Sequence, residues 1–525
     1  MKTRDHSSVA SKRPMPPGKP RAEASISPMG PIRPIGPIPS RPWPVAFISP
    51  MSPISPIGPI SGSPRAGAVL IVTLWIIVVL AGMVLALAQS MRVEGACSAN
   101  YAAVQRAFGV EQGAIQYVLA CVDGLSGAVP TDANMPCNGV IVGNGMFWII
   151  RPNFDNDLRV TYGIVDEASK VSINAANQDM LMMLPRMMRE DAAAIIDWRD
   201  SDQNVTLGGA ESEFYMTLPD PYQCKNAPFE TVEELLLVRG MLPELLYGED
   251  TNRNGRLDDN ENDADQSDPP DNADGKLDRG LYDMVTVYSS EGSATGASSS
   301  SGTQTVDVNS ASSDTLRKSF GASLTGSRLE EVVGQTRRLR PFKNVLDFYF
   351  RVKLTYDEFK GIAGKITANT GSSSGGKGGS KGSSSSVKRG LININTAPRD
   401  VLLCMPGIGD PEADAMIQRR ASRTADEGLA WVVQALQQDK AVLIGSLITS
   451  KSYQFSADIV SVSGDGRAFR RCRIVVDARQ SPPRVVYRRD LTSLGWPLDP
   501  MILDALRAGM GMENVVESTT GLEVR

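Results

Sequence analysis

The longest apolar stretch of the chain covers residues 68–88, with the sequence AVLIVTLWIIVVLAGMVLALA. It carries no charge, and about 20 such residues are enough to cross a bilayer as one helix. No helix breaker follows, and apolar side chains continue at helical spacing at Val104, Phe108, Ile115, Val118 and Leu119. The pattern predicts one long helix, with its first part in lipid and its second part in water.

The residues before this stretch are rich in proline and repeat short units of Pro, Ile, Gly and Ser. Such a segment cannot form helices or interior strands, so residues 1–67 are predicted to be a disordered leader. Its basic excess, which includes Arg41 and Arg65, favours a cytoplasmic location. A start at Met51 would give a shorter leader. A signal peptide cut after Ala88 is the alternative to a retained anchor.

Alternating apolar residues predict strands on both sides of a long central region. The first runs cover 146–150 and 159–165, and the later ones begin near 453, 470 and 484, with a hairpin signal at Gly464-Asp465-Gly466. This arrangement predicts an α+β fold in which a long helix packs on a pilin-like antiparallel sheet that a mostly helical insertion interrupts. The expected division is 1–67 leader, 68–88 transmembrane segment, 89–170 helix and first strands, 171–390 helical insertion with two Gly/Ser linkers, 391–448 hairpin-like repeat, 449–500 last strands and 501–525 tail.

An internal repeat organises the central region. The segments VSINAA from 171, VDVNSA from 306 and ININTA from 392 are each followed, at the same spacing, by an aspartate and a leucine. Each copy predicts a short strand and then a helical hairpin. An Asn, Ser or Thr side chain in each copy is the expected cap of the helix that follows, because its oxygen can accept from free amides.

Composition argues against an enzyme. The chain has 54 basic and 59 acidic side chains, six scattered cysteines and one histidine, His6, in the leader. A His-based triad, a His-rich metal centre and a membrane-tethered hydrolase are therefore disfavoured. The cysteines are either buried small hydrophobes or, in an oxidising compartment, partners in a disulfide such as Cys121 to Cys137.

Residues 249–261 carry the spacing of a calcium loop. Oxygen ligands are expected at positions 1, 3, 5, 7, 9 and 12, with Gly255 at the sharp turn. These positions are Asp250, Asn252, Asn254, the Arg256 carbonyl, Asp258 and Glu261. Calcium requires six or more hard oxygens on a flexible turn, so the loop predicts a structural calcium ion; an Asn/Asp-rich solvated loop is the alternative.

A second acidic segment, PDNADGKLD from 270, repeats part of this pattern. Its twelfth position is Leu281, which offers no ligand. A degenerate second metal site is expected from Asn272, Asp274, Asp278 and Asp283.

The sequence Arg65-Ala66-Gly67 before the apolar run resembles a type IV prepilin leader. The resemblance implies that a prepilin peptidase cuts between Gly67 and Ala68, with methylation of the new terminus. Most members carry a glutamate five residues into the mature chain, where this sequence has Val72. Since an unpaired carboxylate in lipid costs at least a few kcal/mol, its loss suits a subunit with no neighbour above it.

The chain lacks this glutamate and carries the run VDEASKVSIN at 165–174. In both features it resembles the K-type minor pseudopilins of the type II secretion system. The resemblance covers about residues 68–500, with gaps at the Gly/Ser linkers. It implies a single-pass inner-membrane protein with a periplasmic body, bound calcium, I-type and J-type minor pseudopilin partners, and a role in capping and initiating the pseudopilus for export across the outer membrane.

A membrane-anchored DNA receptor of a competence system is the rival interpretation. The third repeat resembles a helix-hairpin-helix element, whose Gly407-Ile408-Gly409 turn lets amides approach a phosphate. The first two copies lack such a turn, the body is acidic, and K-type pseudopilins carry the same insertion without a DNA role. We therefore expect no nucleic-acid partner.

Overall fold

The computed structural model describes residues 66–154, 156–266, 269–291, 305–368 and 388–516. The leader up to residue 65 and nearly all of the two Gly/Ser-rich segments lie outside the described residues, so their predicted disorder stays a prediction. The chain divides into two compact units, residues 1–82 and 83–525.

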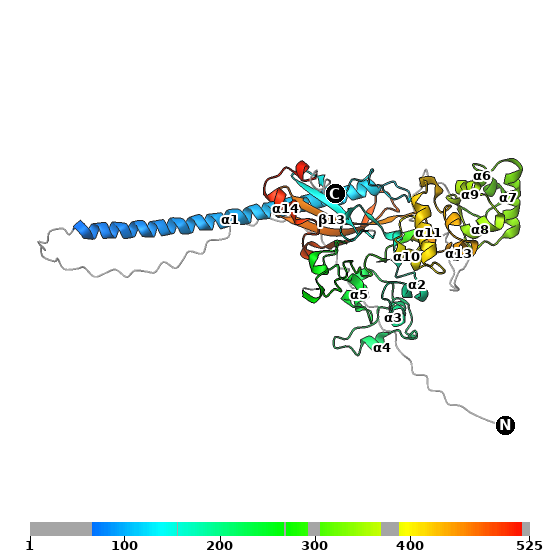
Figure 1. Cartoon of the computed structure of the whole chain (residues 1–525), viewed down its shortest axis with the longest axis horizontal. Coiled ribbons are helices and arrows are strands. Elements are labelled where there is room, and N and C mark those ends of the chain that lie inside the picture. Colours follow the sequence, from blue (N-terminus) through cyan, green and yellow to red (C-terminus); the bar gives the residue numbers. More distant parts are fainter. Residues whose placement is uncertain (1–65, 155, 267–268, 292–304, 369–387, 517–525) are drawn as a thin grey trace, which may run out of the picture. The chain divides into compact units, whose positions relative to one another are not determined.

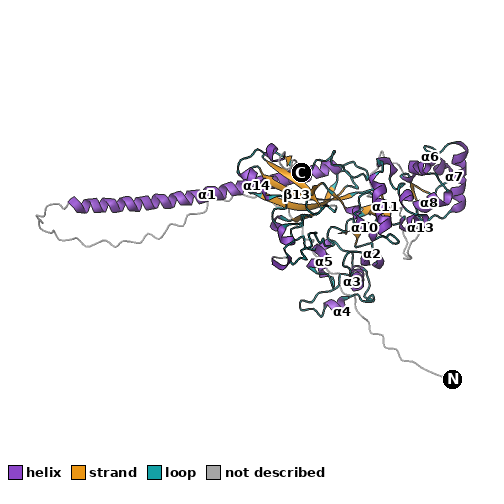
Figure 2. Cartoon of the chain, viewed as in Figure 1, coloured by secondary structure: helices purple, strands orange, loops and turns teal. Residues whose placement is uncertain are grey.

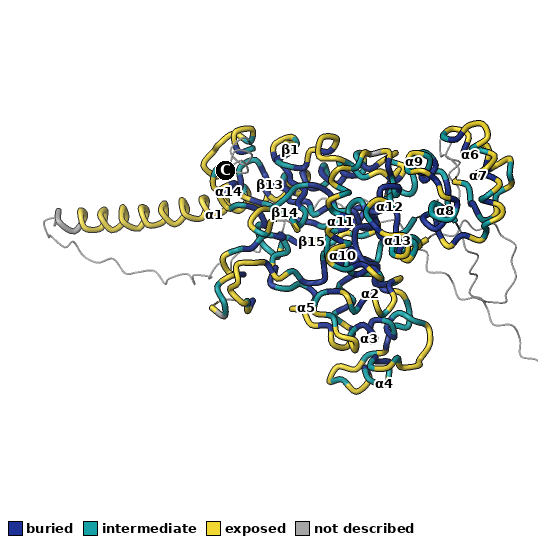
Figure 3. The backbone as a smooth tube through the Cα atoms, turned by 45° about the vertical axis from the view of Figure 1, so that its right-hand side comes forward, coloured by how far each residue is buried: buried dark blue, intermediate teal, exposed yellow. Residues whose placement is uncertain are grey.

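Helix α1 (Ala66–Val122) confirms the prediction of one long helix. Its part from Val69 is the one described helix that is long and apolar enough to cross a membrane, with a mean hydropathy of 3.0 in its most apolar window and no burial there. Figure 3 shows this end of α1 as exposed. A lipid environment accounts for apolar side chains that no protein covers.

Farther along α1, a face of small and branched side chains packs on the sheet. Ala107, Val110, Ala114 and Val118 are buried, whereas Val104 and Phe108 are each 41% exposed. The predicted face was therefore wrong at these two positions. Alanine permits close approach of the helix to the sheet, and the Ser461 hydroxyl donates to the Ala107 carbonyl at 3.1 Å.

The sheet is built from two distant parts of the sequence (Figure 2). Its main strands run antiparallel in the order β1 (Val140–Ile141), β2 (Gly145–Arg151), β13 (Gln454–Ser463), β14 (Phe469–Asp477) and β15 (Arg484–Asp490). Strands β13 and β14 form the predicted hairpin. Residue 150 pairs with residue 458, so the ends of the central region meet in one sheet.

The predicted strand at 159–165 is two short strands. β3 (Thr161–Tyr162) pairs with β2, whereas β4 (Val165–Asp166) pairs with β13. Gly163 lies between them with φ of +141°, a conformation that L side chains rarely adopt. The chain thus changes its partner strand at this glycine.

The two faces of the sheet are covered differently. Phe147 and Ile149 pack with α1 residues on one face. Met146 and Trp148 pack on the other face with helix α14 (Pro500–Arg507), beside β13 in Figure 1. From the sequence we predicted only a tail at residues 501–525. The structure instead has helix α14 at the start of this segment, and Asp499 caps it by accepting from the Met501 amide.

Each repeat opens with a short strand that pairs in parallel with a strand from the end of the same unit. β5 (Val171–Ser172) pairs with β6 (Val285–Thr286), β8 (Val306–Asp307) with β9 (Ile366–Thr367), and β11 (Ile392–Asn393) with β12 (Ile448–Thr449). The helices of the repeats share one apolar core that runs from Val171 to Ile448. They are α2 (Gln178–Met182) and α3 (Arg189–Arg199) in the first, α6 (Ser313–Phe320), α7 (Gly326–Leu339), α8 (Val345–Val352) and α9 (Tyr356–Ala363) in the second, and α10 (Arg399–Leu403), α11 (Asp410–Ala421), α12 (Val432–Ala435) and α13 (Gln438–Ile444) in the third.

The remaining described elements are short. They are η1 (Glu167–Ser169), α4 (Ser212–Tyr215), η2 (Val232–Leu237), α5 (Pro243–Tyr247), η3 (Asp259–Glu261), η4 (Ala264–Gln266), β7 (Ser290–Glu291), β10 (Lys388–Arg389), η5 (Ala425–Glu427) and η6 (Thr492–Leu494).

Candidate functional site

The predicted cleavage site lies in the first turn of α1, which begins at Ala66. Gly67 and Ala68 are therefore helical, but their side chains are outside the described residues. Val72, at the fifth position of the expected mature chain, is 57% exposed and apolar. Cleavage between Gly67 and Ala68 stays a prediction.

The acidic loop adopts a compact turn around its first predicted ligand. The Asp250 carboxylate accepts the Asn254 amide at 3.0 Å and the Gly255 amide at 2.8 Å. Gly255 has φ of +70°, and a Cβ there would lie 2.9 Å from the Pro152 Cα. Glycine is therefore required at the turn, as the spacing predicted.

The end of the loop folds back toward its start. Glu261 is buried and accepts the Thr251 and Asp258 amides at 3.2 and 3.1 Å. The Asn252 and Asn254 side chains both donate to Asp258 Oδ2, at 2.6 and 2.9 Å. Side chains from positions 3, 5 and 9 are therefore drawn into one network.

The electrostatics of this network fit a cation. Burial, and then the charge of Asp283, raise the pKa of Asp250 to about 6. Burial, and then Asp250, raise the pKa of Glu261 to about 8. Buried carboxylates that repel one another are costly unless a positive charge balances them.

The donor set also suits calcium, because Asp250, Asn252, Asn254, Asp258, Glu261 and the Arg256 carbonyl are all hard oxygen donors. Among the described residues, however, no three or more His, Cys, Asp or Glu side chains already form a group that could hold a metal. Calcium binding by this loop stays a prediction.

The sheet holds the loop through a side chain that sequence reasoning missed. Arg471 of β14 is fully buried and donates to the Asn252 and Arg253 carbonyls at 2.5 and 2.6 Å. Its guanidinium also pairs with Asp458 of β13 at 2.7 Å. No motif marked Arg471, since an arginine inside an alternating strand gives no sign that its partners lie in a loop far away.

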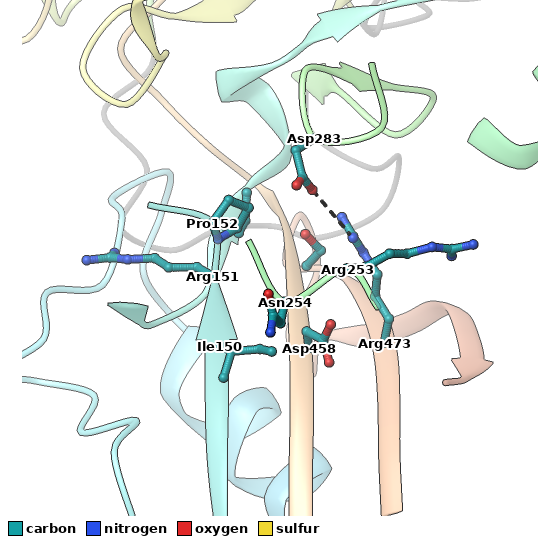
Figure 4. A pocket seen from close by; sticks show the side chains of 10 residues that line it. Ile150, Arg151, Pro152, Arg253, Asn254, Asp283, Asp458 and Arg473 are labelled. Carbon is teal, nitrogen blue, oxygen red and sulfur yellow. Dashed lines mark ion pairs between the residues drawn. The ribbon is translucent and has the colours of Figure 1, made fainter. Parts of the chain in front are cut away.

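A small polar pocket lies where the loop meets the sheet (Figure 4). Arg253 and Asn254 line it from the loop, and Asp458 lines it from the sheet. Arg473 extends from β14 toward Asp283, with the two side chains 3.8 Å apart. Asp283 therefore lies beside the first loop and not only near the second acidic segment.

The second acidic segment runs next to the start of the first loop. Gly248 forms an antiparallel bridge with Arg279, and the Asp278 amide donates to Glu249 at 3.0 Å. The Asn272 and Asp274 side chains accept amides within their own turn, from Asp274 and Lys276, each at 2.8 Å. A second metal site from Asn272, Asp274, Asp278 and Asp283 stays a prediction.

The predicted side-chain caps occur in the first two repeats, a few residues after the strand motif, and not in the third. Asn177 and Ser312 cap α2 and α6, and Pro398, which has no such side chain, precedes α10. Asn174 instead exchanges hydrogen bonds with the Phe229 backbone. The Thr396 hydroxyl donates to the buried Asp166 at 2.5 Å and not to an amide of α10.

Each repeat contains an arginine that holds the turn after its strand. Arg199 donates to the Ile173 and Ala176 carbonyls, Arg340 to Val308 and Ala311, and Arg420 to Ile394 and Ala397. In every copy the two acceptors lie three residues apart. Arg199 and Arg420 lie 26 residues after their first acceptor, whereas Arg340 lies 32 residues after its own.

The Gly-rich turn of the third repeat is blocked as a phosphate site. The Gly409 amide, at the start of α11, donates to the Glu412 carboxylate of the same helix at 3.1 Å. Asp410 and Asp414 flank it, both paired with Arg399. A DNA phosphate at this terminus would meet carboxylates instead of free amides.

The six cysteines are all free thiols. Four of them are buried, namely Cys137, Cys224, Cys404 and Cys472, and the Cys137 thiol donates to the Met135 carbonyl at 3.2 Å. Their role in the structure is that of small buried side chains.

Part of the first repeat and the segment after it match a known family. Residues 172–247 match the family model described as type II secretion system (T2SS), protein K. No curated protein matches the chain. Among solved structures, the chain is similar to a chain of the GspK-GspI-GspJ complex of the type 2 secretion system from enterotoxigenic Escherichia coli, at 10% identity over 76% of this chain and 98% of that chain, with a TM-score of 0.36. The family match begins in the first repeat and ends at Tyr247, just before the acidic loop.

Proposed function

We propose that this chain belongs to the type II secretion system protein K family and is a minor pseudopilin that caps and initiates the pseudopilus during export across the outer membrane. It acts as a structural subunit and not as an enzyme. The family match at residues 172–247 is the observation that carries this proposal.

The arrangement of elements supports the same function. A long helix packs by its second part on an antiparallel sheet, as a pilin-like subunit requires. The three repeats, as hairpin-like helical units resembling the SAM fold, would form an insertion between β4 and β13. Such an insertion would make the subunit bulky above its helix, which suits the end of a fibre better than its shaft.

The first part of α1 supports a single-pass anchor in the inner membrane. We propose that the end before it faces the cytoplasm, that prepilin peptidase cuts after Gly67, and that the body from residue 89 lies in the periplasm. Val72 would leave no carboxylate in lipid for a subunit above to neutralise.

The partners proposed for the chain are the I-type and J-type minor pseudopilins, as in the complex named for the solved structure. Calcium at Asp250, Asn252, Asn254, Arg256, Asp258 and Glu261 would fix the loop that Arg471 joins to the sheet. It would neutralise the buried carboxylates and so stabilise the body; it would supply no catalysis.

The decisive experiment is mass spectrometry of the amino terminus after co-expression with a prepilin peptidase, for the wild type and for Gly67→Ala. We expect a wild-type chain that begins at Ala68 and an uncut variant. A chain cut after Ala88, or an uncut wild type, would contradict the prediction of a prepilin leader followed by a retained membrane anchor. Co-purification with the I-type and J-type subunits then tests assembly.

DNA reception is the second candidate, because of the Gly407-Ile408-Gly409 turn. The Glu412 carboxylate on the Gly409 amide disfavours it.

A further inference from the structure

Strand β15 is the last strand of the large sheet and has an open edge. It pairs with β14 on one side, and no other described strand pairs with it. An edge of this kind presents main-chain N–H and C=O groups with which another strand can pair. Five of its seven residues are exposed, including the adjacent valines Val485 and Val486 at 37% and 51%. The edge therefore offers both hydrogen-bonding groups and apolar area.

Side chains on both faces of β15 hold the strand in place. Tyr487 and Arg489 contact Glu233 of η2, and the tyrosine hydroxyl lies 3.2 Å from the carboxylate. Successive side chains of a strand point to opposite faces, and Arg488 donates to Glu111 of α1 at 2.5 Å. A strand that is already fixed loses little further freedom when it pairs with an incoming segment.

A cavity of about 280 Å³ lies beside the first half of β15. Its walls come from the first repeat, from the pair of strands β7 and β10, and from the sheet. Val486 lines it from a bulge of β15, where this residue has no register partner on β14. Phe229 and Tyr288 add aromatic surface to a lining that is otherwise largely polar. The cavity is large enough to receive a side chain of a segment bound along the edge.

The charge around this cavity is positive. Arg389 of β10 lines the cavity, and Arg484 of β15 lies opposite Asp477, which also lines it. Asp477 is already paired with Arg479 at 2.6 Å. In the part of the chain that the structure describes, neither Arg389 nor Arg484 has an ion-pair partner. Carboxylates of a binding partner would supply the missing counter-charges.

We propose that the edge of β15 binds an extended acidic segment of a partner protein. The segment adds a strand antiparallel to β15 and places an acidic side chain in the cavity that Val486 and Arg389 line. In this mode of recognition, main-chain hydrogen bonds supply affinity and the pockets for side chains supply specificity. Binding at this edge does not depend on cleavage after Gly67.

The arginines of β15 also decide which strands are rejected. In a pair of β15 edges from two copies of the chain, Arg484, Arg488 and Arg489 would meet like charges, which destabilises strand pairing. Charged side chains on an edge discourage pairing with unselected strands in the same way. An acidic segment is the partner that this edge attracts instead of repelling.

The test is isothermal titration calorimetry of the full chain in detergent with a synthetic peptide of alternating Val and Glu. The peptide is seven residues long, to match β15, and has an amidated C-terminus so that only side chains provide carboxylates. We expect saturable binding with a Kd below about 100 μM, weakened at least about tenfold in Arg389→Glu and in Arg484→Glu. Arg338→Glu, at an exposed position of the second repeat, is the matched control and should leave the Kd unchanged. A lack of saturation at about 1 mM peptide, or equal weakening in Arg338→Glu, would overturn the proposal.

Variants of the peptide separate strand pairing from simple charge attraction. Two peptides carry N-methyl groups on alternate residues, on one set or on the other, so that each keeps its charges and loses one row of N–H donors. At least one of them should bind about tenfold more weakly than the parent, and equal binding by both would overturn strand addition. A peptide with Gln in place of Glu should also bind more weakly, and equal binding would overturn the role of the carboxylates. These comparisons use the wild-type chain, so they decide the question even if Arg389→Glu fails to fold.

Discussion

The Arg471 guanidinium donates to the Asn252 carbonyl at 2.5 Å, across 219 residues of sequence. The same side chain pairs with Asp458 on the neighbouring strand, so it joins the acidic loop to the centre of the sheet. The loop is therefore part of the folded body of the protein and not a free surface segment.

Arg471→Met should destabilise the chain by about 3–5 kcal/mol, because removing the buried partner takes away the hydrogen-bonded counter-charge of Asp458, whose side chain is only 11% exposed. Calcium should also stabilise the variant less than the wild type, since the loop loses its support. Guanidinium unfolding of the full chain with calcium or with a chelator measures both effects. Arg484→Ala, on an exposed position of β15, is the matched control and should change stability by less than about 0.5 kcal/mol.

The three repeat arginines should contribute similar stability. Replacing Arg340 by alanine leaves the Val308 and Ala311 carbonyls without their donor, at a cost of about 1–3 kcal/mol. Arg199→Ala and Arg420→Ala should behave alike, whereas Arg338→Ala, on an exposed position near Arg340, should be neutral. Thermal unfolding that showed all four variants equal to wild type would contradict this role.

Asp166 should make stability depend on pH in the mildly acidic range. Burial raises its pKa above the ordinary value, against hydrogen bonds from Ser452, Thr396, Asn393 and the Ala168 amide. Between the ordinary and the raised pKa, the folded chain keeps a proton that the unfolded chain has released, so the free energy of unfolding falls as pH rises through this window.

Asp166→Asn should remove this part of the pH dependence, because the amide does not titrate. Unfolding midpoints measured across the acidic range, with the exposed Asp123→Asn as control, provide the test. If the unfolding midpoints of the variant followed the same pH profile as those of the wild type, Asp166 would have the same proton affinity in the folded and the unfolded chain.

The chain should not bind duplex DNA with the salt dependence of a phosphate-contacting protein. Glu412 occupies the Gly409 amide, and the flanking Asp410 and Asp414 repel phosphate. Fluorescence anisotropy of labelled duplex at low salt is the measurement. Binding that weakened steeply with salt and disappeared in Gly407→Ala would favour the DNA-receptor interpretation.

The local pattern of the sequence determined the long helix, most strands of the sheet, the β13–β14 hairpin and the triplicated strand. These features depend on periodicity, turn residues and repetition, which are properties of neighbouring residues. The calcium-loop spacing also put Gly255 at the turn where the structure requires glycine.

The tertiary structure alone decided which side chains hold these parts together. Val104 and Phe108 are exposed because alanines at 103 and 107 give the closer contact with the sheet. Arg471 donates to carbonyls 218 and 219 residues away, Asp166 accepts from Ser452 across 286 residues, and each repeat arginine reaches back at least 23 residues. Such contacts form between residues that only the tertiary fold brings close together. A buried polar side chain pairs with a group that lies near it in the fold, and the residues next to it in the sequence do not indicate which group that is.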